Sequence, residues 1–152
     1  MIIKKSIILG LLVMLVIACQ AQNTDLERIR TNYKQAVSDK KLCLLMIQEL
    51  SAGPKNSLQL SYLGAFQTIW ATHVSNPISK LRTFNRGKKK IDQAAMSEPG
   101  NVEIRLLRLS VQTNSPSFLG YKNNIDEDKK FIQANNKNIT SAVLRDVMAV
   151  LI

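Results

Sequence analysis

Few residues of this 152-residue chain are of the types that carry out nucleophilic or metal-assisted chemistry. His73 is the only histidine, and the two cysteines are Cys19 and Cys43. Catalytic Ser-His and Cys-His pairs and most zinc sites require histidine, so the sequence argues against these chemistries. We interpret His73 as a residue near a helix end. Cys43 lies among apolar residues and is interpreted as a small buried hydrophobe. We therefore expect no cofactor, no metal ion and no enzymatic activity.

An acidic run at 123–128 (NNIDED) has the composition of a calcium-binding loop. Its spacing does not fit an EF-hand, which requires glycine at the sixth position and glutamate at the twelfth. Acidic residues also favour the first turn of a helix, where they complement the helix dipole. The run therefore predicts the beginning of a helix.

Basic residues are densest between 82 and 90, where Arg82, Arg86, Lys88, Lys89 and Lys90 fall within nine positions. A solvent-exposed helix face is the usual explanation for such a run. Binding of anions or of phospholipid headgroups is the alternative. Lys88, Lys89 and Lys90 are therefore candidate residues for an anion or a partner.

The formal net charge is +10, and 19 basic and 11 acidic residues remain when Lys4 and Lys5 are left out. Such an excess favours nucleic acid, phospholipid headgroups or acidic proteins as partners. The first 22 residues make nucleic acid the least expected of these, because they resemble an export signal. Lys4 and Lys5 precede an apolar stretch at 7–17, which is short for a membrane-spanning helix.

The apolar stretch leads into Val16-Ile17-Ala18-Cys19, which resembles the lipobox of bacterial lipoproteins. The resemblance implies cleavage before Cys19 and attachment of a diacylglyceryl group to its sulfur. Two or three acyl chains exceed the one-chain limit at which membrane anchoring is marginal. Gln20 stands where an aspartate often signals retention in the inner membrane, which favours the outer membrane, facing the periplasm. Ordinary signal cleavage, giving a soluble periplasmic or secreted protein, and an uncleaved anchor are the alternatives.

The remaining residues, 23–152, are expected to form a single all-α domain of six or seven helices arranged as antiparallel hairpins. The chain has only 6 glycines and 4 prolines, which suits helices better than a turn-rich sandwich. Helix starts are expected near Asn23 or Thr24, at Asn56 or Ser57, at Asn76-Pro77 and at Thr140 or Ser141. The C-terminal helix is expected to dock on the domain or to form an oligomer contact.

Residues 94–121 contain two helix ends and two helix starts. Pro99-Gly100 ends one helix and Asn101 caps the next, while Asn114 or Ser115, with Pro116 at the first helical position, is expected to begin another. The segment after Asn101 alternates like a strand, but its length and caps favour a helix.

On such a helix, Arg105 and Arg108 share a face with Gln112. A buried guanidinium must meet an acid, and the nearest acids are Asp126, Glu127 and Asp128. We therefore expect at least one of the two arginines to pair with this group. The alternative is an enzyme or enzyme accessory in which Arg105, Arg108 and Tyr121 surround an anion-binding cleft.

Two resemblances support helical hairpins. Gly87, Ile91, Ala94 and Pro99 are similar to the second helix of a tetratricopeptide repeat, which implies a degenerate array of hairpins, because no 34-residue period runs along the chain. Residues 103–108 (EIRLLR), 114–121 (NSPSFLGY) and 128–132 (DKKFI) resemble a pattern shared by a group of small, uncharacterised exported bacterial proteins. That resemblance implies kinship but no activity. Together these features predict a lipid-anchored, non-enzymatic binding or scaffold module with an unidentified protein partner.

Overall fold

The computed structural model describes residues 25–53 and 56–152 and is helical throughout, with no strand in these two ranges. The signal segment and Cys19 lie outside the described residues. A helical stretch at 25–35 is followed by six further α-helices and two short 3₁₀ turns: α2 (Lys40–Ala52), α3 (Ser57–His73), α4 (Pro77–Ser97), α5 (Val102–Asn114), η1 (Ser117–Leu119), α6 (Ile125–Ala134), η2 (Asn136–Asn138) and α7 (Ala142–Leu151). The expected all-α class is confirmed.

Side-chain caps fix the beginnings of four helices. Asp39, Asn56 and Asn76 each accept a hydrogen bond from the backbone N–H three residues later. Asn101 accepts from the N–H groups of both Glu103 and Ile104. Each cap satisfies a donor that the helix itself leaves unpaired. The residues between Asn101 and Asn114 are therefore helical, and the strand alternative is excluded.

The expected helix start at Asn114 or Ser115 is wrong. The Asn114 amide donates to the Ser110 carbonyl, and the Ser115 hydroxyl donates to the Val111 carbonyl. Both side chains thus close α5 instead of capping a new helix. Pro116 introduces only the turn η1, which ends at Gly120 with φ of 62°, a conformation that favours glycine. The next helix, α6, begins at Ile125.

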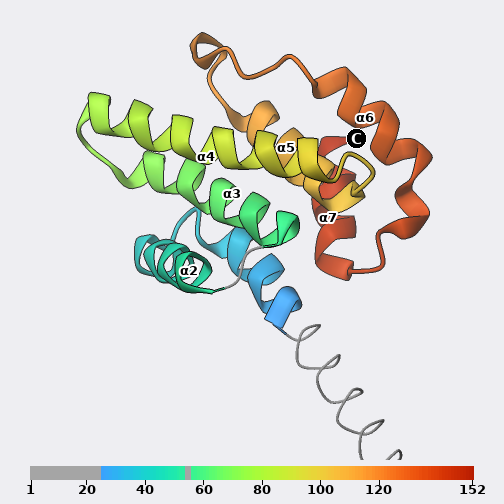
Figure 1. Ribbon diagram of the computed structural model, residues 1–152, viewed down its shortest axis with the longest axis horizontal. Helices are drawn as coiled ribbons and strands as arrows, with labels where there is room; N and C mark the ends of the chain where they lie inside the picture. The colour runs from blue at the N-terminus through green and yellow to red at the C-terminus, as the bar shows by residue number, and fades with distance from the viewer. Residues whose placement is uncertain (1–24, 54–55) are drawn as a thin grey trace, which may run out of the picture.

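The helices form hairpins, with α3 and α4 side by side across the middle of the molecule (Figure 1). In Figure 1, α2 lies on one side of this pair and α6 on the other, while the stretch 25–35 is hydrogen-bonded directly to α5. Gly64 of α3 and Gly87 of α4 meet at the crossing. A Cβ on Gly64 would lie 2.6 Å from the Gly87 carbonyl oxygen, and a Cβ on Gly87 would collide with the Gly64 carbonyl. The two glycines therefore allow the backbones of α3 and α4 to approach closely.

Helix α5 lies between two apolar clusters. Leu107 and Val111 pack with Tyr62 and Phe66 of α3 in the larger cluster. Leu106 and Leu109 belong to a second cluster with Ile132, Leu144 and other residues of α6 and α7. Helix α5 is therefore packed between neighbours on two sides. In the part of the chain described, no helix has the length and apolar character needed to cross a membrane.

Candidate functional site

The two arginines of α5 converge on one acid of α6. Arg108 donates from Nε to Oδ2 and from Nη2 to Oδ1 of Asp128, both at 2.7 Å. Arg105 donates from Nη1 to Asp128 Oδ1 at 2.9 Å and also to Glu127. Asp128 is fully buried and Arg108 is 8% exposed. The expected pairing of α5 with the acidic run is confirmed, for Glu127 and Asp128.

Tyr121 is held by α4 and not by these arginines. Its hydroxyl donates to Asp92 Oδ1 at 2.7 Å, and the Lys88 ammonium lies 4.9 Å from the centre of its ring. Burial, together with the bond to Asp92, raises the pKa of Tyr121, so the phenol stays neutral. Arg105, Arg108 and Tyr121 therefore each satisfy an acid of the same chain, and this arrangement supports a structural role.

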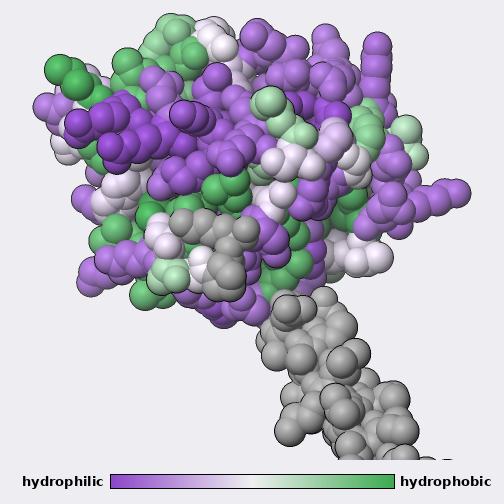
Figure 2. All heavy atoms as spheres, in the orientation of Figure 1, coloured by the Kyte–Doolittle hydropathy of each residue, from purple (hydrophilic) through white to green (hydrophobic). Residues whose placement is uncertain are grey.

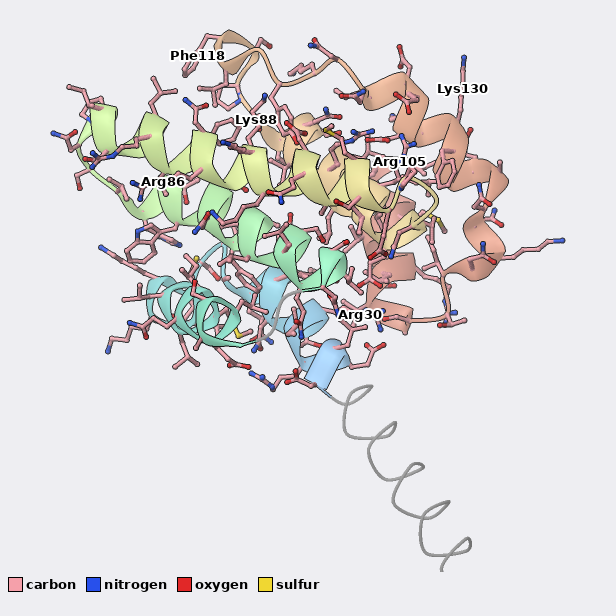
Figure 3. The ribbon with its side chains drawn as sticks, viewed as in Figure 1. Arg30, Arg86, Lys88, Arg105, Phe118 and Lys130 are labelled. Carbon is pink, nitrogen blue, oxygen red and sulfur yellow. The ribbon has the colours of Figure 1, made fainter. Side chains whose placement is uncertain are left out.

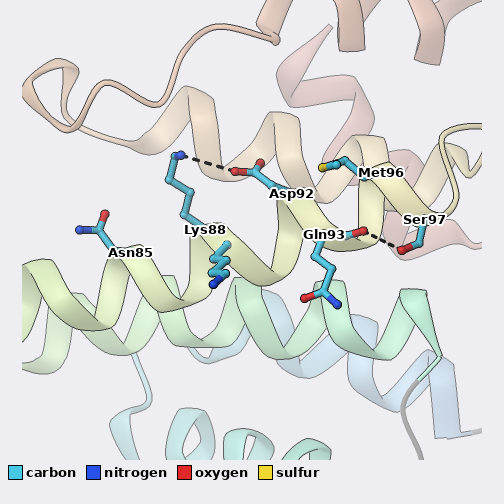
Figure 4. A pocket seen from close by; sticks show the side chains of 7 residues that line it. Asn85, Lys88, Asp92, Gln93, Met96 and Ser97 are labelled. Atoms are coloured by element: carbon cyan, nitrogen blue, oxygen red, sulfur yellow. Dashed lines mark hydrogen bonds and ion pairs between the residues drawn. The ribbon is translucent and has the colours of Figure 1, made fainter.

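Of the three lysines at 88–90, Lys88 and Lys89 line a shallow hollow on the outer face of α4 (Figure 4). Lys88 forms an ion pair with Asp92 at 3.5 Å, Lys89 is exposed, and Lys90 is half-buried. All residues lining the hollow come from α4 alone: Asn85, Lys88, Lys89, Asp92, Gln93, Met96 and Ser97. A single helix face with one lysine already paired is a weak anion site, since an exposed charge pair contributes at most about 1 kcal/mol.

A second buried polar network joins the beginning of the domain to its end. Glu103 accepts hydrogen bonds from the Tyr62 hydroxyl at 2.6 Å and from Arg30 Nε at 2.8 Å. Arg30 also donates to Glu27, which in turn accepts from the Ser141 hydroxyl. Sequence reasoning missed this role of Glu103. The available sequence signal was that Glu103 is the one acidic residue of α5 and lies next to apolar residues.

The described part of the domain also contains an apolar groove of about 850 Å³. It lies where the end of the stretch 25–35 meets α3, the first two turns of α4, the end of α5, the η1 loop and the end of α7. We call it the apolar groove. Its apolar lining includes Val37, Ile69, Ala71, Leu81, Phe84, Val111, Phe118, Leu119, Val147, Val150 and Leu151. Sequence reasoning missed the groove, because six separate segments must come together before it exists.

Several apolar side chains on the rim of this groove project into solvent. Phe118 is 85% exposed and Val150 is 86% exposed. Figure 3 places Phe118 at the outer end of the loop that follows α5, pointing away from the helices. In Figure 2, apolar atoms gather at the upper left of the visible face, near the beginning of α4 and this loop. Exposed apolar surface next to a groove is characteristic of binding sites.

Metal chemistry finds no support in the described part of the chain, where no group of three or more His, Cys, Asp or Glu side chains could hold an ion. Comparisons with protein-family models, curated proteins and solved structures find no match.

Proposed function

We propose that this protein is a lipid-anchored, non-enzymatic binding module of the bacterial cell envelope, which binds an apolar molecule or segment in the apolar groove. The acyl chains on Cys19 hold the domain at the membrane, with the outer membrane facing the periplasm as the favoured location. The helical hairpins, which resemble a degenerate tetratricopeptide array, act as a rigid scaffold for the groove.

The groove is the observation that carries this proposal. Its volume of about 850 Å³ falls in the range of small-molecule sites in proteins, which are mostly apolar with a few polar groups. Its walls come from six segments that together contribute to both apolar clusters, so packed helices support the groove. By contrast, the ion pairs of Arg30, Arg105 and Arg108 are internal and hold helices together.

The anchor is supported by the lipobox-like sequence that ends at Cys19. Residue 25, the first described residue, is six positions after Cys19, and a fully extended chain over six positions spans at most about 20 Å. A domain tethered this closely has constant access to lipids and to other membrane-attached molecules. A soluble periplasmic protein with the same groove is the alternative.

An apolar fluorescent dye, N-phenylnaphthylamine, tests the proposal. A chain beginning at residue 19 with Cys19→Ser should bind the dye and enhance its fluorescence. Val150→Asp, at the rim of the groove, should weaken dye binding, because it removes apolar surface from the rim and places a charge beside the site. Met96→Asp is the matched control, since Met96 is 81% exposed on α4 and lies outside the groove. Equal dye affinity in both variants would contradict the proposal.

A further inference from the structure

One corner of the apolar groove is polar. Tyr33 and Lys34, at the end of the stretch 25–35, and Ser110 and Asn114, at the end of α5, all line the groove. The Tyr33 hydroxyl and the Ser110 hydroxyl lie 3.2 Å apart and share one hydrogen bond. Asn114 is one helical turn beyond Ser110, and Lys34 follows Tyr33. We call these four residues the polar corner.

The polar corner has more hydrogen-bond donors than the hydrogen bonds between its own residues use. Two hydroxyls carry two hydrogens, and their mutual bond uses one, so one O–H remains. Asn114 donates one amide hydrogen to the Ser110 carbonyl and keeps a second. Burial raises the pKa of Tyr33, so this phenol keeps its hydrogen at neutral pH. Lys34 has no ion pair with another described residue and is exposed.

Helix ends near the corner would repel an anion through their free carbonyl groups. Several of these carbonyls are already occupied. The Val111 carbonyl accepts from the Ser115 hydroxyl, and the Gln35 carbonyl accepts from the backbone N–H groups of Ser38 and Asp39. Among the described residues that line the groove, Asp146 is the one acid, and Lys80 is a second cation that offsets it.

We infer that the groove takes a single-chain anionic amphiphile, whose hydrocarbon chain lies along the apolar walls and whose head group accepts hydrogen bonds at the polar corner. This inference rests on the proposed function and names the ligand class of the same site. A free fatty acid and a lysophospholipid with a phosphate head share this chemistry. In both, an anionic oxygen meets the Lys34 ammonium and the spare hydrogens of the Tyr33–Ser110 pair and Asn114.

Photo-crosslinking of the full chain in lipid nanodiscs tests the inference. The probes are palmitate, hexadecanol and palmitoyl lysophosphatidate, each with a photoreactive diazirine in the chain, and crosslinked peptides are identified by mass spectrometry. Both anionic probes should label groove peptides more strongly than the alcohol. Lys34→Gln should reduce anionic labelling about two- to fivefold, the effect of losing one exposed charge interaction. Labelling by hexadecanol should not change.

Lys89→Gln is the matched control, because Lys89 is an exposed lysine of α4 outside the groove. Labelling by only one of the two anionic probes would identify the source of the head group. Equal groove labelling by all three probes, unaffected by Lys34→Gln, would overturn the inference and leave the proposed function standing. No groove labelling by any probe would overturn both.

Discussion

Arg108 donates two parallel hydrogen bonds of 2.7 Å to Asp128, and this bidentate pair joins the middle of α5 to the first turn of α6. Asp128 is fully buried and also accepts from Arg105, so three N–H groups meet one carboxylate. Bidentate arginine–carboxylate pairs of this kind fix orientation as well as charge. This contact holds α6 in register on α5, beside the cluster around Ile132.

Removing one partner should leave a buried charge unpaired. Arg108→Ala is expected to lower the free energy of unfolding by about 3–5 kcal/mol, as measured by urea denaturation. Arg82→Ala, at an exposed position of α4, should change it by under about 0.5 kcal/mol. The double variant Arg108→Met with Asp128→Leu should recover much of the loss, because neither member of the pair then leaves the other as an unpaired buried charge, and Arg105 keeps Glu127. A loss below about 1 kcal/mol for Arg108→Ala would show that the Arg108–Asp128 pair contributes little to the free energy of unfolding.

The crossing of α3 and α4 leaves no room for a methyl group. Gly87→Ala places its Cβ against the Gly64 backbone, which cannot give way like a flexible side chain. We expect a loss of about 1–3 kcal/mol in unfolding free energy, measured by thermal or urea denaturation. Gly100→Ala is the control, because nothing lies within 4 Å of its added Cβ. If Gly87→Ala and Gly100→Ala were equally stable, α3 and α4 could move apart at the crossing without loss of unfolding free energy.

Cys43 should be an unreactive thiol in the folded protein. Burial raises its pKa to about 12, and its Sγ lies 3.4 Å from the Phe66 carbonyl oxygen. In a chain carrying Cys19→Ser, a thiol reagent near pH 8 should modify Cys43 only after denaturant unfolds the domain. Rapid modification without denaturant would mean that α2 and α3 open readily around this side chain.

Lipid attachment predicts different behaviour for the wild type and Cys19→Ala in a detergent solution that separates into two phases on warming. The wild type should enter the detergent phase with a mass increased by a diacylglyceryl group and acyl chains. Cys19→Ala should not gain this mass. The same mass for both proteins, apart from the substitution, would exclude lipid attachment at this residue.

Local sequence signals predicted much of this fold. Asn56, Asn76 and Asn101 cap helices as their positions indicated, because a cap depends only on residues within one turn. The pairing of Arg108 with the acidic run was also predictable, since a charge in an apolar helix must find a partner. The expected helix start at Asn114 failed, because the same polar side chains can close the preceding helix.

The apolar groove could not be predicted in this way. Ile69, Leu81 and Val147 have the spacing of core residues, and nothing in their own helices shows that a neighbour is missing. Gly64 and the Glu103 network were missed for the same reason, because their partners lie on other helices. Such features depend on how distant segments meet and not on periodicity along one helix.

The central claim, that the apolar groove binds another molecule, is tested most directly by blocking the groove. Thr72 is exposed and lines the groove, whereas Thr113 is exposed on α5 and lies outside it. Dye titrations of Thr72→Trp and Thr113→Trp compare the same substitution at the two positions. We predict that Thr72→Trp weakens binding of N-phenylnaphthylamine about tenfold or more, because the indole occupies the site, while Thr113→Trp binds like the parent chain. Unchanged affinity in Thr72→Trp, with the fold intact by circular dichroism, would contradict the claim.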